Sequence, residues 1–418
     1  MKLLSSIKNG ARAAGPWAAA AAGLAFPIST ALEGILIGAA VALLLLSGDY
    51  ASKLSALKKS AIVMPVVLIL VMYALGTLYS TADLKEIWHY LSKGYRILLI
   101  PLLMILFQEK RIRDCALGGF QAACVMILLI SYGIWLGVVP AGAPFNGTPE
   151  NPTVFKAHIT HSLLMAFSAF LFAVTARFSD NRLIKVVSLI FCFLIAVNVF
   201  FLVSSRTGQL ALALLICYFL GACRRRRGVC VALLVILVMS LAGVMMQETA
   251  LRRGLDNLSI EAAEWWHGSK QIEKSAIYRL EVYTITLNII KERPVFGLGT
   301  GGFPKAFTEK VGGADKAEKY NPYNPHNEYL LIAVQFGVVG LCIWLYLFLK
   351  QWSVAGRLSS PVNCLMARGL VILILSAGVV SSTLIDHTEG LFYYWVSAIA
   401  FAPEITNSSD KEICAQPI

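Results

Sequence analysis

The chain has 418 residues, of which 57% are hydrophobic and only 14% are charged. Soluble globular proteins carry about a quarter charged residues, so this composition excludes an ordinary soluble domain and predicts an integral membrane protein. The formal net charge of +12 would suit a nucleic-acid-binding protein, but the positions of the basic residues follow membrane topology, and no nucleic-acid partner is expected.

Apolar runs of membrane-spanning length predict an all-α polytopic protein with about 12 transmembrane helices. The first run follows Lys2, Lys8 and Arg12 and is interpreted as an uncleaved signal anchor. The predicted spans lie near residues 13–26, 30–47, 61–80, 95–107, 115–137, 161–177, 185–203, 209–222, 229–246, 327–349, 365–382 and 391–402.

Lysine and arginine are distributed unevenly between the two sets of loops that join these spans. About twenty fall on one side, against about five on the other, which is the bias expected between cytoplasmic and outer loops. We therefore expect both termini in the cytoplasm, and we expect the run Arg224–Arg227 to contact anionic membrane lipids there. The outer basic residues are Lys85, Lys93, Arg96, Lys156 and Arg206.

These assignments divide the chain into three parts. Residues 1–246 carry the first nine spans, residues 247–325 form an outer cap, and residues 326–418 carry the last three spans and a short tail. The cap contains an amphipathic stretch, residues 274–293, that ends at Pro294 and places Tyr278, Val282, Ile285 and Ile289 on one face. None of the nine cysteines lies in the cap, so no disulfide framework is expected.

The stretch YNPYNPHNEYLLIAVQFGVVG, residues 320–340, joins the cap to the tenth span. Its prolines keep the approach extended, and His326-Asn327 stands where the apolar run begins. The pattern predicts a helix that continues without a break to Leu349, with Gly337 and Gly340 on a face suited to close helix packing.

His-Asn, nine residues, Gly, two residues and Gly resembles the signature of bacterial O-antigen ligases, members of the O-antigen polymerase/ligase superfamily. Three other elements strengthen the resemblance. Arg206 lies in the Ser204–Gly208 turn, and Arg279 precedes a Pro-x-x-Gly-x-Gly element by about fifteen residues. Asp386 occupies the last outer turn, where His387 and Glu389 are interpreted as helix caps.

The resemblance implies a GT-C-like fold with one large periplasmic helical loop. It also implies transfer of O-antigen from undecaprenyl diphosphate to lipid A–core on the periplasmic face of the inner membrane. Within it, Arg206 and Arg279 would bind the diphosphate, Asn327 would contact substrate, and His326 would accept the proton of the acceptor hydroxyl. Asp386 would orient the imidazole or the acceptor, and a direct displacement would invert the anomeric centre.

Several motifs are missing from the sequence. It has no P-loop, no Asp-x-Asp pair and no Cys/His cluster with zinc spacing, so neither ATP, nor a metal, nor another cofactor is expected. Lys85, Lys93, Arg96 and Lys156 are further candidates for binding phosphate.

Three alternative functions stay open. An O-antigen polymerase or a protein O-oligosaccharyltransferase would share the superfamily and the donor and differ in the acceptor. A secondary transporter would show internal repeats and charged or broken helices at mid-membrane, and the predicted span interiors are almost free of charge.

Overall fold

The computed structural model describes residues 2–222, 276–318, 320 and 323–405. The regular elements in this part of the chain are helices. They are α1 (Lys2–Ala25), α2 (Thr30–Leu46), α3 (Tyr50–Leu57), α4 (Val63–Leu78), α5 (Leu84–Gly94), η1 (Tyr95–Leu98), α6 (Leu99–Leu106), α7 (Lys110–Trp135), α8 (His158–Phe178), α9 (Arg182–Val197), η2 (Asn198–Leu202), α10 (Arg206–Ala222), α13 (Ala276–Glu292), α14 (Phe303–Val311), α15 (Ala314–Glu318), α16 (Glu328–Ala355), α17 (Pro361–Gly378) and α18 (His387–Ile405).

Among the described residues, five helices are long and apolar enough to cross a membrane, namely α7, α8, α9 with η2, α16 and α17. The number becomes six if α2 and α3, which bend by 116° at their junction, count as one broken span. Helices occupy every predicted span position except residues 229–246, which lie outside the described residues. These helices support an all-α polytopic membrane protein, while the count of twelve spans stays a prediction.

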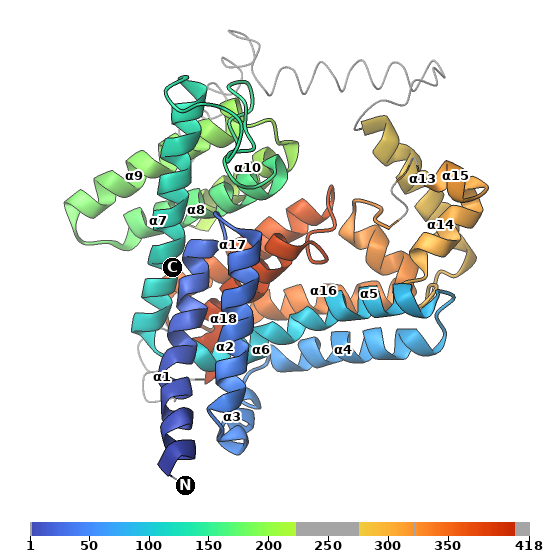
Figure 1. Ribbon diagram of the computed structural model, residues 1–418, viewed down its shortest axis with the longest axis horizontal. Helices are drawn as coiled ribbons and strands as arrows, with labels where there is room; N and C mark the ends of the chain where they lie inside the picture. Colours follow the sequence, from blue (N-terminus) through green and yellow to red (C-terminus); the bar gives the residue numbers. More distant parts are fainter. Residues whose placement is uncertain (1, 223–275, 319, 321–322, 406–418) are drawn as a thin grey trace.

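The helices fall into three neighbouring groups (Figure 1). Helices α1, α2 and α7 pack together, α8 packs against α9 and α10, and α4 runs beside α16. Helix α18 lies in the middle of the molecule, where Trp395 packs against Phe26, Phe107 and Phe392. The indole Nε1 donates a 2.7 Å hydrogen bond to the carbonyl of Ala19, so the ring is fixed by a polar contact as well as by packing.

The amphipathic stretch predicted in the cap is helix α13. Its side chains Val282 and Ile289 are each 1% exposed and pack with Phe303 and Phe307 of α14 and with Val334 of α16. The apolar face therefore holds the described part of the cap, α13 to α15, against the first half of α16, as Figure 1 shows at its right-hand side.

Helix α16 is broken at Gly337, so the prediction of an unbroken helix to Leu349 was wrong. The glycine has φ 63° and ψ −162°, a conformation outside the helical region. In a continuous helix the N–H groups of Val338 and Val339 would bond to the carbonyls of Val334 and Gln335. The break leaves these four backbone groups without their helical partners.

The segment that follows α13 supplies new partners for all four groups. The Val338 N–H donates to the Pro294 carbonyl at 2.8 Å and the Val339 N–H donates to the Val295 carbonyl at 3.3 Å. In return the Leu298 and Gly299 N–H groups donate to the Val334 and Gln335 carbonyls at 3.0 and 2.8 Å. The Pro-x-x-Gly-x-Gly element is thus inserted into the break of α16, which satisfies backbone groups that would be costly to bury unpaired.

Glycine is required at both sides of this contact. A Cβ on Gly337 would lie 2.2 Å from the Val295 carbonyl oxygen, and a Cβ on Gly297 would lie 2.5 Å from the Gln335 carbonyl carbon. Both positions have positive φ, and so does Gly299, whose Cβ would meet the Gly76 carbonyl of α4. The Pro-x-x-Gly-x-Gly element therefore packs closely against the backbone of α16 and α4.

Replacing Gly337 by alanine is expected to destabilise the protein. The added methyl group collides with the Val295 carbonyl, and the strained backbone alone costs roughly 1–3 kcal/mol. The thermal unfolding midpoint of the detergent-purified variant, followed by circular dichroism, should fall, or the folded yield should collapse. Gly38→Ala is the matched control, because it lies in helix α2 with nothing within 4 Å of the added Cβ. An unchanged midpoint for Gly337→Ala would contradict the role of the break.

Candidate active site

His326 and Asn327 lie where the extended approach enters α16. Asn327 is the N-cap of the helix: its Oδ1 accepts a 3.0 Å hydrogen bond from the Leu330 N–H, and its Nδ2 donates to the Val379 carbonyl at 2.7 Å. His326 has φ 54°, an uncommon conformation for a non-glycine residue. The pair therefore ties the start of α16 to the segment that follows α17, residues 379–386.

Two further side chains hold this junction together. The Tyr283 hydroxyl, from α13, lies 3.1 Å from the His326 carbonyl and 3.2 Å from the Val379 carbonyl and can donate to either. Asn324 Oδ1 accepts from the His326 N–H at 2.8 Å and from the Ser382 hydroxyl at 2.7 Å. Helix α13, the start of α16 and segment 379–386 thus meet around His326.

Arg279 stands one helical turn before Tyr283 on α13, on the same side of the helix. Burial lowers the pKa of His326, and the positive charge of Arg279 lowers this pKa further. The imidazole is therefore neutral at neutral pH and able to accept a hydrogen bond or a proton. Arg279 and His326 therefore share one electrostatic environment.

Asp386 lies on the same segment and faces α5. Burial raises the pKa of its carboxyl group, while Lys93 of α5 and a hydrogen bond with Ser381 act in the opposite direction. Burial also lowers the pKa of Lys93, an effect that Asp386 opposes. Beside them, the buried Glu328 carboxylate accepts the Leu384 N–H at 3.0 Å, which fixes the backbone two residues before Asp386.

Arg206 is the first residue of α10, and other contacts fix its turn. The Ser204 N–H donates to Asn151 Oδ1 at 3.0 Å, and the Ser162 hydroxyl donates to Ser205 Oγ at 2.6 Å. Gly208 lies so close to α8 that a Cβ there would be 2.3 Å from the Ser162 side chain. Thus His326 and Asn327 lie beside segment 379–386, which carries Asp386, and the charge of Arg279 acts on His326. The turn of Arg206 is held on α8 instead.

A short π-helix, η2, precedes the Arg206 turn. Its first residue, Asn198, is buried and donates a 2.8 Å hydrogen bond to Ser131 Oγ, and its Oδ1 lies 3.4 Å from His161 Nε2. Such π-bulges occur frequently at functional sites because they redirect the chain. No sequence pattern marks this group, since lone polar residues in apolar runs give no periodic signal.

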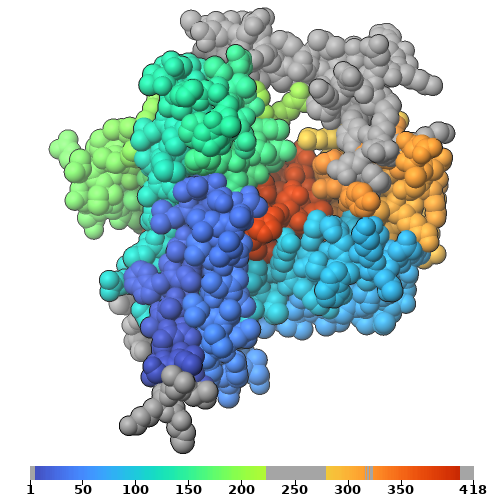
Figure 2. All heavy atoms as spheres, in the orientation of Figure 1, coloured from blue at the N-terminus to red at the C-terminus, as the bar shows by residue number. Residues whose placement is uncertain are grey.

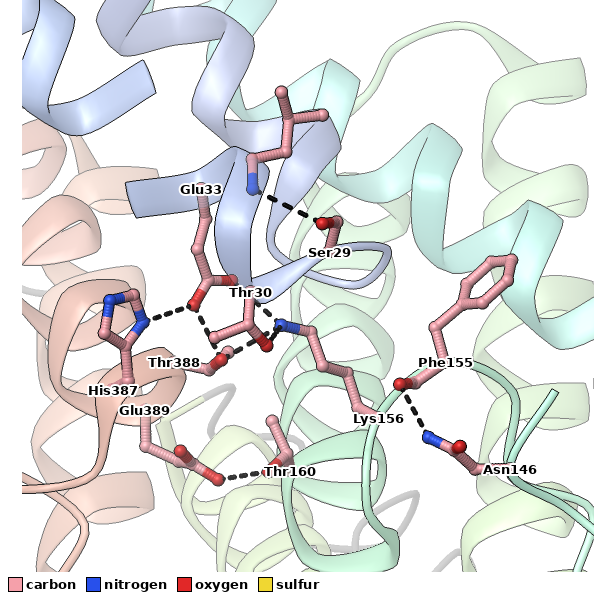
Figure 3. Close-up of polar contacts among 11 residues, drawn as sticks. Ser29, Thr30, Glu33, Asn146, Phe155, Lys156, Thr160, His387, Thr388 and Glu389 are labelled. Atoms are coloured by element: carbon pink, nitrogen blue, oxygen red, sulfur yellow. Dashed lines mark hydrogen bonds and ion pairs between the residues drawn. The ribbon is translucent and has the colours of Figure 1, made fainter. Parts of the chain in front are cut away.

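A second polar cluster lies where segment 379–386 leads into α18 (Figure 3). Glu33 of α2 is fully buried, and Lys156 is 5% exposed. Lys156 Nζ contacts Thr30 Oγ1 at 2.7 Å, Thr388 Oγ1 at 3.0 Å and Glu33 Oε2 at 3.1 Å. The other oxygen of Glu33 lies 3.1 Å from His387 Nδ1 and accepts from the Thr388 hydroxyl at 2.6 Å.

This cluster corrects two sequence-based interpretations. Lys156 was a candidate for binding phosphate, but its ammonium is enclosed by Glu33 and two hydroxyl groups. His387 and Glu389 were interpreted as helix caps, but His387 pairs with Glu33, and the buried Glu389 accepts a hydrogen bond from Thr160. Glu33 was missed altogether, because a lone acidic residue near the start of an apolar run reads as part of the helix's first turn.

The surface above this region is hollowed (Figure 2). The C-terminal part of the chain, drawn in red, forms the floor of a depression between the blue N-terminal helices, the cyan α5 region and the orange segment. Segment 379–388 belongs to this C-terminal part and contacts α2, α5 and α13 through the side chains described above.

An apolar groove of about 670 Å³ lies beside the break of α16. Its walls come from α4, from residues 294–297 and from α16 on both sides of Gly337, and Arg293 stands among its lining residues. A groove of this size and composition can accommodate a hydrocarbon chain. Within the described residues no group of three or more His, Cys, Asp or Glu side chains could hold a metal ion.

Residues 190–345 match a family model described as O-antigen ligase. This match supports an O-antigen ligase assignment for this part of the chain. The matched part of the chain contains Arg206, Arg279, His326 and the break of α16, whereas Asp386 lies beyond it. The match supports a glycosyltransferase-like function of the O-antigen ligase or polymerase type. No curated protein matches the chain significantly.

Removing the charge of Arg279 should raise the pKa of His326. With Arg279→Gln the positive neighbour is lost, so the imidazole becomes protonated at a higher pH than in the wild type. The rate at which diethyl pyrocarbonate modifies His326, followed against pH by peptide mass spectrometry, reports this change because only the neutral ring reacts. Lys305→Gln is the control, since it removes a charge from α14. An unshifted profile for Arg279→Gln would show that the charge of Arg279 does not act on His326.

Proposed function

We propose that the protein transfers O-antigen from undecaprenyl diphosphate to the lipid A–core oligosaccharide, with the site facing the periplasm. The observation that carries the proposal is the junction of α13 and α16, where Arg279 lies beside a neutral His326 within the family's matched region. A sugar on a diphosphate is already activated, so such an enzyme needs neither nucleotide nor metal to supply the leaving group.

The cations would act on the diphosphate. Charge develops on this group as the glycosidic bond breaks, and guanidinium groups stabilise it through planar, paired hydrogen bonds. Arg279 is the first candidate because it stands at the junction, and Arg206 is the second because it begins α10 with an exposed side chain. Lys93 and Arg96 on the α5 side are auxiliary candidates, since Lys93 lies near Asp386.

The acceptor hydroxyl would be held by the remaining polar groups. His326 is neutral and can accept a hydrogen bond or a proton from a sugar hydroxyl, while Asn327 keeps the backbone of His326 in place. Asp386 would orient the acceptor, and direct displacement on the opposite face of the donor would invert the anomeric centre. The apolar groove between α4 and α16 supports a lipid-linked donor, because it offers space for a polyprenyl chain.

The proposal predicts a loss of transfer in three variants. With purified protein, lipid-linked donor and lipid A–core acceptor, His326→Ala, Arg279→Ala and Arg206→Ala should each lower the rate by about 10²-fold or more. Arg279→Lys should recover little, because an ammonium lacks the planar fork of a guanidinium. Product is measured by gel shift of the labelled acceptor.

Circular dichroism and gel filtration of each variant should match the wild type, which separates lost chemistry from lost folding. Lys305→Ala, on α14, is the matched charge control and should transfer normally. Normal transfer by His326→Ala at normal expression would remove that residue from the mechanism. The reaction should also proceed in excess chelator, and a strict requirement for Mg²⁺ would contradict the metal-free proposal.

Deletion of the gene distinguishes this function from the second candidate, O-antigen polymerisation, which the family also allows. Without the proposed transferase, long O-antigen chains should accumulate on undecaprenyl diphosphate while the lipopolysaccharide ends at its core. Lipid extraction and gel electrophoresis display both pools. A core that carries one repeat unit, with no pool of long lipid-linked chains, would assign the protein to polymerisation. An intact lipopolysaccharide with an altered glycoprotein would indicate a protein acceptor.

A further inference from the structure

Glu33 and His387 form a carboxylate–imidazole pair on the wall of the site. The side chain of Glu33 is fully buried, whereas 41% of the His387 side chain is exposed. His387 Nδ1 lies 3.1 Å from Glu33 Oε1, so a carboxylate at this distance selects the tautomer with the proton on Nδ1. The lone pair of Nε2 is then available to a ligand.

The surroundings of the pair hold the Glu33 side chain and the ring in place. Lys156 Nζ lies 3.1 Å from the second oxygen of Glu33, which compensates the buried negative charge. The imidazole rests on Gly34 of α2, where a Cβ would lie 3.3 Å from Cε1 and 3.4 Å from Nε2. A glycine at this position lets the ring approach the helix, and the ring is thereby fixed on two sides.

The Glu33–His387 pair is adjacent in sequence, through His387, to the candidate site. His387 follows Asp386 directly, and segment 379–386 carries the hydrogen bonds to Asn327, Tyr283 and Asn324. The segment thus has the His326 junction at one end and the Glu33 pair at the other. His387 therefore belongs to the same ten residues, 379–388, that His326 lies beside.

We propose that His387, oriented by Glu33, is the group that takes the proton of the acceptor hydroxyl. This inference rests on the proposed transfer function and assigns its proton step. The hydroxyl proton moves to Nε2 while the hydroxyl oxygen bonds to the anomeric carbon. The bond from that carbon to the diphosphate breaks, and the diphosphate leaves with the electron pair. Glu33 stabilises the imidazolium, which then releases its proton to water.

The two histidines would therefore have different roles. His326 lies beside Arg279, which disfavours a second positive charge there, so it suits a neutral hydrogen-bonding role next to the anionic donor. His387 faces a carboxylate, which favours the positive charge that proton transfer creates. The other charged groups around the pair are Lys156 from the segment before α8, Glu389 on α18, and Asp386 with Lys93 opposite it.

The pH dependence of kcat in the reconstituted reaction tests the inference. Wild-type activity should fall toward acid pH, because a protonated imidazole cannot accept a proton. His387→Gln should lower kcat by about 10²-fold or more and abolish this acid limb. Glu33→Gln should have a similar effect, and Glu33→Asp should restore part of the activity and the limb, since it returns a carboxylate.

His387→Gln is the decisive variant because it alters a half-exposed side chain and leaves the buried Glu33–Lys156 pair intact. Thr160→Val is the control for local disruption, since it removes the hydrogen bond to Glu389 and should keep the acid limb. His326→Ala should be slow and should also keep the acid limb. An acid limb that survives in His387→Gln and disappears in His326→Ala would overturn the inference. A wild type without transfer would refute the proposed function instead.

Discussion

The insertion of residues 294–299 into the break of α16 is the contact on which the site depends. Four backbone groups exposed by the non-helical Gly337 are paired with this segment, so α13 is anchored at its C-terminal end. At its other end the same helix places Arg279 and Tyr283 beside His326. Leaving one such buried group unpaired costs about 1–3 kcal/mol, so the two segments stabilise each other strongly.

The glycine signature consequently has a backbone explanation. Gly337 lies against the backbone of Val295, and Gly297 lies against the backbone of Gln335. A side chain at either glycine would collide with a main-chain atom. Gly340 lies 3.2 Å, measured from an added Cβ, from the Met72 sulfur of α4, which allows α4 and α16 to pack closely. The motif therefore builds the frame of the site and one wall of the apolar groove, while the chemistry resides in neighbouring side chains.

The site extends beyond the matched family region. Residues 190–345 supply Arg206, Arg279 and His326, but the segment that carries Asp386 and His387 follows α17, and its buried partner Glu33 comes from α2. Burying Glu33 and Lys156 together is expensive for both ions and gives little net stability, so such pairs are retained where they specify an arrangement. Here the pair fixes the start of α18, and with it the end of segment 379–388.

Sequence alone determined the class of the protein and supplied the candidate residues of its site. Low charge, long apolar runs and the basic loops predicted a polytopic helical protein, because lipid imposes these features on any spanning segment. The amphipathic face of α13 was predicted from Val282, Ile285 and Ile289 by helical periodicity, and His326, Arg279 and Asn327 by the motif they belong to.

Only the tertiary structure decided which distant residues meet. The break at Gly337 depends on hydrogen bonds with a segment about forty residues earlier in the chain. No local sequence pattern can therefore predict it. The same is true of Glu33, Lys156 and His387, which lie on three separate segments and become a charged cluster only when α2, α8 and α18 pack. Local periodicity records which face of a helix is apolar; which buried charge faces which is a property of the packed fold.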